Sequence, residues 1–340
     1  MYRPSFLMIL LSLWSCFILG RADASEWEKT DYIWNFGIIS SCDRGLIKSP
    51  EEYFRKNANF NLKAYQGIKK GDVVWVKAQH MSIFCNKILP KVKDPFVLVI
   101  SAGVESFPSE CENFNIEALL SKKKIIHVFA QNCDYSGSSK KVTHLPLGID
   151  FHTMAYKNEK HGEKALPLEQ EAELKDLLET AQSTHLRKKL AFVDFQHNDT
   201  IRYGSMQRYL KLGEDRTTIF EYLKTTGLID YSDPLKRIDL WRKKIEYAFS
   251  ISPHGNGLDC HRTWEDLLLG CIVIVKTSSL DPLYEGLPVV IVQDWSELTE
   301  ENFDYWIEKY RDAFDNPAYR EKLSYLYWWN RIQEKAQPFK

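Results

Sequence analysis

The stretch that most constrains the fold of this chain runs from residue 249 to residue 295. A short apolar run at 249–251 ends in the turn-forming sequence Ser-Pro-His-Gly-Asn-Gly at 252–257. A helical pattern covers 258–269, and a second apolar run covers 271–275. Because a proline and two glycines interrupt the backbone before the helical pattern, the predicted order is strand, glycine loop, helix, strand.

The residues at either end of the predicted helix define its limits. Asp259 offers an N-cap and Gly270 offers a C-cap. Glycines let the main chain approach an anionic ligand closely, and the exposed amides and positive dipole of a helix start attract negative charge. The loop therefore predicts a phosphate-binding site that includes His254, Gly255, Asn256 and Gly257.

Arg262 and Glu265 sharpen this prediction. Three positions apart on a helix, they share one face near its N-terminal end. An arginine there binds a diphosphate, and a carboxylate accepts a hydrogen bond from a ribose or sugar hydroxyl. The alternative is an intrahelical ion pair, worth about 0.2–0.5 kcal/mol. Lys276, at the end of the following strand, is either a further diphosphate ligand or a solvent-facing lysine.

The same segment resembles the C-terminal core of exostosin-like glycosyltransferases, glycosyltransferase family 47. The resemblance rests on Phe-Ser-Ile-Ser-Pro-His-Gly at 249–255, on Arg262 and Glu265, and on the apolar runs at 270–275 and 287–295. The chain departs from the family pattern at His254, where the family often has arginine, and at Cys260, where serine is common. The resemblance implies a nucleotide-sugar donor, UDP- or GDP-linked, and inversion at the anomeric carbon.

The resemblance also implies an α/β fold of the GT-B type, in which two Rossmann-like domains enclose a cleft. A charged and polar stretch at 157–189 separates two sets of apolar runs. We therefore predict an acceptor-side domain at 25–185 and a nucleotide-sugar-binding domain at 186–340. The aromatic and charged tail from Glu300 onwards predicts helices that pack back across the domains.

Residues 1–24 have the pattern of a secretory signal peptide. An apolar stretch at 6–20 follows Arg3 and is short for a membrane span, and Ala-Asp-Ala at 22–24 is a small-x-small cleavage site. An uncleaved signal anchor is the alternative. Both place the protein in an exported compartment or a secretory-pathway lumen, such as the Golgi or endoplasmic reticulum of a eukaryote. The six cysteines beyond residue 24 are an even number, compatible with disulfides there.

Apolar runs at 32–39, 73–76, 96–100 and 125–129 predict parallel strands of the first domain, and a further run at 190–195 opens the second set. Helices are expected at 169–180, 216–225 and 234–247. Ligands of open α/β sheets bind outside the carboxyl ends of the strands, so the polar loops after the first-domain strands predict the acceptor side.

Inversion requires a general base that takes the proton of the acceptor hydroxyl. The candidate carboxylates at strand ends are Glu105, Asp134 and Asp150. Glu105 is the first choice and Asp134 the alternate. A loop carboxylate that caps the next helix is the competing interpretation of Glu105.

No metal and no cofactor besides the nucleotide sugar are expected. The chain contains no Asp-x-Asp sequence, and a possible pair of His254 and His261 has no third ligand nearby in the sequence. The net charge of −1 gives no overall attraction to nucleic acid or to an anionic membrane. The expected partners are a nucleotide sugar and a glycan or glycoconjugate acceptor, with membrane contact only through an uncleaved N-terminal segment.

The function predicted from these features is an inverting glycosyltransferase that moves a sugar onto a glycan or glycoconjugate. A non-catalytic protein of the same fold that binds glycans or nucleotide sugars is the alternative. A dinucleotide-dependent oxidoreductase or epimerase is disfavoured, because Gly255-x-Gly257 lacks the third glycine of the dinucleotide-binding motif.

Overall fold

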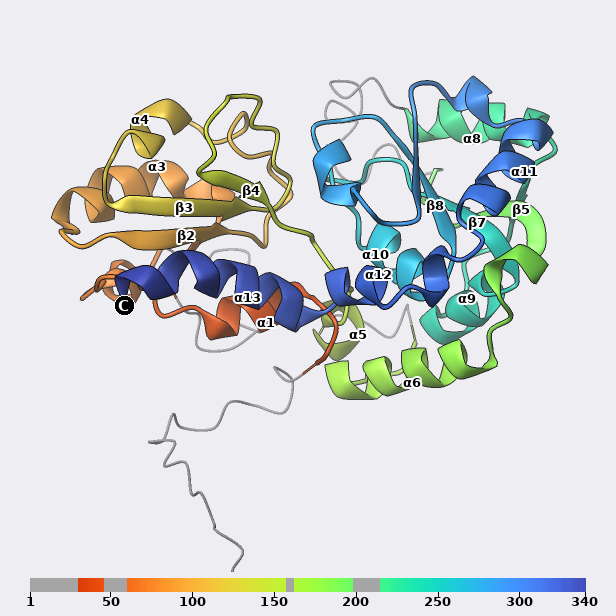
Figure 1. Ribbon diagram of the computed structural model, residues 1–340, viewed down its shortest axis with the longest axis horizontal. Helices are drawn as coiled ribbons and strands as arrows, with labels where there is room; N and C mark the ends of the chain where they lie inside the picture. Colours follow the sequence, from red (N-terminus) through yellow and green to blue (C-terminus); the bar gives the residue numbers. More distant parts are fainter. Residues whose placement is uncertain (1–29, 46–59, 157–161, 198–214) are drawn as a thin grey trace, which may run out of the picture.

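The computed structural model describes residues 30–45, 60–156, 162–197 and 215–340. The expected signal peptide at 1–24 lies outside the described residues. Two separate parallel sheets, each packed against helices, make up two Rossmann-like domains (Figure 1). The expected α/β fold with two such domains is therefore confirmed.

The first sheet has four parallel strands in the order β1-β2-β3-β4. These are β1 Val73–Val76, β2 Phe96–Ile100, β3 Ile125–Ala130 and β4 Val142–His144. Every residue of β1 and β2 is buried, as expected for a sheet covered on both faces. The apolar runs predicted three of these strands, while β4 was missed because it is short and half-buried.

The second sheet has five parallel strands in the order β6-β5-β7-β8-β9. These are β5 Lys188–Val193, β6 Ile229–Tyr231, β7 Tyr247–Ile251, β8 Ile272–Lys276 and β9 Val289–Val292. The strand, loop, helix and strand predicted from residue 249 onwards are confirmed as β7, the loop, α10 and β8. The edge strand β6 was missed because only three residues pair.

The run at 32–39 was predicted to be a strand, and this prediction is wrong. Its residues form the helix α1, Asn35–Ser41, preceded by Ile33 and Trp34. Most of this segment is buried, Ile33 and Trp34 being 1% exposed. A short run that is apolar on all sides has no distinguishing period, so burial in a helix and burial in a strand look alike in the sequence.

The remaining helices connect or cover the strands. In the first domain, the helical turn α3, Met81–Ile83, and α4, Ile116–Leu120, follow β1 and β2. The segment between the sheets holds α5 His152–Tyr156 and α6 Pro167–Thr180. The second domain contains α8 Arg216–Thr225, α9 Arg237–Lys244, α10 His261–Leu268, α11 Glu300–Lys309 and α12 Pro317–Lys322.

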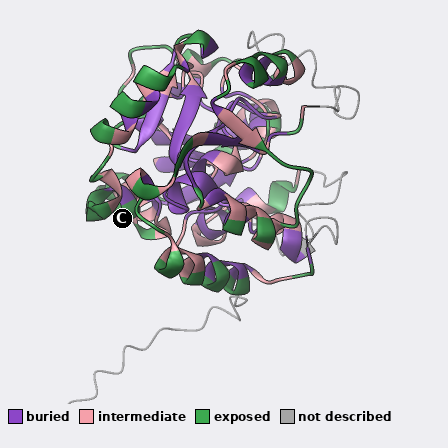
Figure 2. Cartoon of the chain, turned by 90° about the vertical axis from the view of Figure 1, so that its right-hand side faces the viewer, coloured by how far each residue is buried: buried purple, intermediate pink, exposed green. Residues whose placement is uncertain are grey.

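The last helix, α13 Tyr325–Ala336, returns to the first domain. It contacts β2, β3 and α1, as Figure 1 shows for the dark blue helix beneath the first sheet. One cluster of buried residues runs from Val97 and Val99 through Trp328 and Ile332 to Trp264. The expected helices that pack back across the domains are therefore present, and this one of the three buried clusters spans both domains. Figure 2 shows the strands mostly buried inside the molecule and exposed residues on the helices at its surface.

Two further sequence features are settled among the described residues. No helix there has both the length and the apolar character needed to cross a bilayer. The six cysteines expected to be compatible with disulfides are all free thiols. They are Cys42, Cys85, Cys111, Cys133, Cys260 and Cys271.

Candidate functional site

The glycine loop joins β7 to α10 and lies against the first domain. A Cβ atom added to Gly257 would stand 2.8 Å from the side chain of Asn132 and 2.9 Å from the carbonyl oxygen of Val104. Both partners come from loops at the carboxyl ends of first-domain strands, β3 and β2. Gly257 thus allows the backbone of one domain to touch the strand-end loops of the other.

Asp259 does not cap α10, so the predicted N-cap is wrong. The N-cap position is Cys260, which makes no side-chain capping bond. The buried Asp259 carboxylate instead accepts hydrogen bonds from the indole of Trp264 at 2.9 Å and from the backbone amide of Leu147 at 2.7 Å. It therefore ties the loop to the segment that leaves the first domain. The C-cap is Leu269, one position before the predicted Gly270. Gly270 follows it with φ +77°, the left-handed conformation in which a glycine commonly ends a helix.

Arg262 lies inside the second domain, in a buried ion network. Its Nε donates to Asp194, which also accepts from Lys244 at 2.7 Å. Lys244 in turn contacts the fully buried Asp266 at 2.6 Å. The Nη1 atom of Arg262 is buried and has no hydrogen-bond partner. The guanidinium charge is thus compensated by the protein, while one of its donor groups is still unused.

Glu265 faces the segment between the domains. Its Oε1 accepts from the backbone amide of Asp150 at 3.2 Å and lies 4.0 Å from Nη1 of Arg237. Its Oε2 is 3.5 Å from the indole nitrogen of Trp241. Arg262 and Glu265 therefore have separate partners, and the intrahelical ion pair considered as an alternative does not form.

The other residues expected to bind the donor lie around the loop. His254 turns inward and bonds through Nδ1 to the carbonyl of Leu258 at 2.8 Å. The amide of Gly255 donates to the carbonyl of Gly257 at 3.0 Å, which closes the turn containing Asn256. Lys276 ends β8 and is half-buried.

Sequence reasoning overlooked Arg216, the first residue of α8, which also braces the glycine loop. Its Nε donates to the carbonyl of His254 at 2.9 Å, and its guanidinium lies 5.7 Å from the ring centre of Phe195. Arg262 approaches the same ring, at 6.0 Å. Two arginines from different helices therefore flank one aromatic ring beside the loop. No motif in the sequence links α8 to the loop.

The candidate general bases differ in how far their oxygens are already engaged. Asp134 accepts from both the amide and the hydroxyl of Ser109, in the manner of a turn-capping carboxylate. Glu105 lies in the loop after β2, and its Oε2 is buried without a hydrogen-bond partner. Lys77 is close enough that the Glu105 charge favours its protonated form and partly offsets the lowering of the Lys77 pKa by burial.

The carboxylate of Asp150 has four polar partners. Oδ1 lies 2.8 Å from Nδ1 of His152 and accepts from the amide of Thr153 at 2.9 Å. Oδ2 accepts from the hydroxyl of Thr153 at 2.6 Å and from Nη2 of Arg237 at 3.1 Å. Burial alone raises the pKa of Asp150, but the charges of His152 and Arg237 outweigh burial and hold that pKa well below its usual value.

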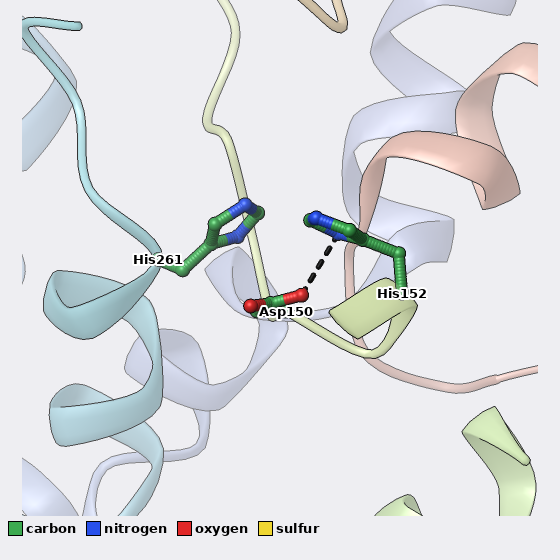
Figure 3. Close-up of side chains that lie close together, drawn as sticks. All are labelled: Asp150, His152 and His261. Atoms are coloured by element: carbon green, nitrogen blue, oxygen red, sulfur yellow. Dashed lines mark ion pairs between the residues drawn. The ribbon is translucent and has the colours of Figure 1, made fainter. Parts of the chain in front are cut away.

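His152 and His261 complete a cluster around Asp150 that sequence reasoning missed. The two rings approach one another from α5 and α10, with centres 5.2 Å apart (Figure 3). Nδ1 of His261 is 2.6 Å from the carbonyl oxygen of Gly148, so it carries the ring proton. Burial lowers the pKa of His261, which keeps its ring neutral at pH 7.

The cluster also corrects the expectation that no set of metal ligands comes together. One ligand atom from each of Asp150, His152 and His261 can be chosen so that all lie within 4.8 Å of one another. His254, which the sequence analysis paired with His261 only to disfavour a metal site, does not belong to this set. However, Asp150 already binds the permanent cation Arg237 and has four donors on its two oxygens. The cluster therefore suits proton transfer better than cation binding.

No family model matches the chain, and no curated protein matches it in sequence. Among solved structures, it is similar to a UDP-forming α,α-trehalose-phosphate synthase from Burkholderia xenovorans in complex with glucose-6-phosphate. That match has 14% identity and a TM-score of 0.35, and it covers 78% of this chain and 74% of the synthase. An α-glucosyltransferase in complex with UDP-glucose and DNA matches at 11% identity and a TM-score of 0.26, over 78% and 75% of the two chains. At such low scores these likenesses carry no weight, and the fold rests on the strand order.

Proposed function

We propose that this protein is an inverting, exostosin-like glycosyltransferase that moves a sugar from a UDP- or GDP-linked donor to a hydroxyl of a glycan or glycoconjugate. The observation that carries the proposal is the contact between the glycine loop and the strand-end loops of the other domain, through Gly257, Asn132 and Val104. Ligands of parallel α/β sheets bind outside the carboxyl ends of the strands. Here such ends from both sheets meet beside a cluster of proton-transferring groups.

The donor is assigned to the second domain. The loop and the start of α10 supply backbone amides and the positive end of a helix dipole, and Arg216 and Arg262 supply cations. These groups stabilise the leaving diphosphate without a divalent metal. Glu265 is assigned to a ribose or sugar hydroxyl, which it reaches if the ligand displaces its bond to the amide of Asp150.

A non-catalytic binding protein is the second candidate. It is favoured by one observation, the pairing of Arg262 with Asp194, because a compensated charge attracts a diphosphate less than a free one. For the protein's location we propose an exported compartment, on the strength of the sequence of residues 1–24.

The test is a thermal-shift screen against UDP, GDP and adenosine diphosphate, followed by turnover assays with the matching nucleotide sugars. We expect one nucleoside diphosphate to raise the melting temperature and its sugar conjugates to be consumed, with or without EDTA. Binding without turnover of any conjugate would support the non-catalytic candidate. Turnover that EDTA abolishes and manganese restores would contradict the metal-independent mechanism.

A further inference from the structure

The Asp150–His152 pair has the arrangement of a base and its orienting carboxylate. Nδ1 of His152 lies 2.8 Å from Oδ1 of Asp150, a separation that requires the ring proton on Nδ1 and makes Nε2 the proton-accepting nitrogen of the neutral ring. The carboxylate fixes the ring orientation and stabilises the imidazolium that forms when Nε2 takes a proton. Both side chains are 15% exposed, so the pair is largely but not completely shielded from solvent.

The geometry of the cluster distinguishes His152, whose ring is held by a carboxylate, from His261, whose ring is held by a carbonyl. His261 bonds to a neutral carbonyl, which stabilises an imidazolium less than a carboxylate does. The charged and titratable groups that face the pair are Arg237 from α9 and His261 and Glu265 from α10. Arg237 keeps Asp150 ionised, so the carboxylate stays an acceptor while the ring gains its proton.

The pair also lies where the acceptor must enter. His152 begins α5 in the segment after the first domain, and its ring points toward His261 at the first turn of α10 (Figure 3). That turn carries Arg262, which is assigned to the donor diphosphate. An acceptor hydroxyl bound beside His152 would therefore lie on the first-domain side of a donor that is bound at the start of α10.

We propose that His152 is the general base of the transfer and that Asp150 positions its ring, an assignment that rests on the proposed glycosyltransferase function. The acceptor oxygen forms a bond to the anomeric carbon as its proton passes to Nε2 of His152. The bond between the anomeric carbon and the diphosphate oxygen breaks, and the nucleoside diphosphate leaves with the electron pair. In this assignment Glu105 is not the general base, and its role is to stabilise the loop after β2.

The test compares His152→Asn, Asp150→Asn and Glu105→Gln in the full chain. Asparagine at 152 can still donate to Asp150 but offers no imidazole nitrogen. We expect His152→Asn to lower kcat by about a hundredfold or more, since general-base catalysis contributes about 10²–10⁴-fold. Donor KM and the affinity for nucleoside diphosphate should stay within about twofold of the wild type.

Two further measurements separate catalysis from structure. The acidic limb of the kcat–pH profile should disappear in His152→Asn and shift in Asp150→Asn, while Glu105→Gln should keep both the limb and near-normal kcat. Added imidazole should restore part of the turnover of His152→Ala but not that of Asp150→Asn. A folded His152→Asn enzyme with near-normal kcat, or a hundredfold loss confined to Glu105→Gln, would overturn the assignment.

The wild-type enzyme separates failure of this inference from failure of the proposed function. A wild type that binds no nucleoside diphosphate and consumes no nucleotide sugar defeats both proposals. A wild type that is active, together with an equally active His152→Asn, defeats only the base assignment and leaves glycosyl transfer standing.

Discussion

Arg262 shows how one residue can be recognised correctly as special while its surroundings stay hidden. The sequence marks it as a cation near a helix start, but not the carboxylate that compensates it. Asp194, the residue after β5, pairs with Arg262 and also with Lys244 of α9, because neighbouring strands and helices of the second domain pack side by side. Its buried Nη1, without a partner, is the group that remains for a ligand.

Replacing Arg262 by alanine should weaken binding of the nucleoside diphosphate by about ten- to a hundredfold. A charge-assisted hydrogen bond contributes about 1.5–3 kcal/mol, and that bond is lost with the guanidinium. The measurement is isothermal titration calorimetry below the melting temperature of the variant, because loss of the buried ion pair also lowers stability.

Arg242→Ala is the matched control, since the Arg242 side chain is 61% exposed and, among the described residues, its ion-pair partner is Asp239 on α9. The affinity of Arg242→Ala for the nucleoside diphosphate and its free energy of unfolding should be close to those of the wild type. Wild-type affinity in folded Arg262→Ala would remove this residue from the donor site.

At the scale of elements, the return of α13 to the first sheet changes the chemistry of β3. His127 is 4% exposed and bonds to the hydroxyl of Thr143 at 2.8 Å. Burial, together with the positive charges of Lys335 and Arg331 on α13, lowers the pKa of His127 to about 4. Burial, aided by two cations on the C-terminal helix α13, thus keeps the core residue His127 uncharged.

This lowered pKa predicts an acid-dependent loss of stability. Between pH 6.5 and about 4 the unfolded chain binds a proton at His127 and the folded chain does not, so the free energy of unfolding falls as pH falls. The full effect is about 3 kcal/mol, from 1.36 kcal/mol for each unit between the two pKa values.

Urea unfolding at several pH values between 4 and 6.5 measures this contribution. His127→Asn, which has no titratable group at that position, should show a shallower dependence on pH than the wild type. Parallel curves for the two proteins would mean that His127 titrates alike in the folded and unfolded chains.

At the scale of the whole molecule, one of the three buried clusters spans the two domains. Trp328 and Ile332 on α13 belong to the same buried cluster as Trp264 and Leu267 on α10. The hydrogen bonds of Asp259 to Leu147 and of His261 to Gly148 add polar links between the halves. Domain positions are therefore fixed by apolar burial as well as by the loop contacts.

Trp328→Ala should lower the free energy of unfolding by about 3–5 kcal/mol, because it removes a large side chain that is 3% exposed and leaves a cavity. Leu326→Ala on the same helix is the control. Leu326 is 61% exposed, so its loss should change stability by about 0.5 kcal/mol or less. Chemical denaturation measures both. Equal effects would show that α13 does not anchor the core.

The sequence alone determined those elements whose pattern is local. The strands β1 and β2 and the helix α8 begin and end where their apolar or amphipathic patterns do. The glycine loop and the glycine that ends α10, Gly270, were also predicted correctly, because proline and glycine determine the local backbone conformation directly. The α/β class followed from these parts together with the family resemblance.

Only the tertiary structure decided which chemical groups meet. Asp150 was visible as a strand-end carboxylate, but its partners Arg237 and His261 come from helices of the other domain. The carboxylate that pairs with Arg262 and the turn of Asp259 toward Leu147 likewise depend on contacts between distant segments. Patterns over a few neighbouring residues carry no information on such contacts. Residues that are distant in the sequence meet only when whole helices and strands pack against one another.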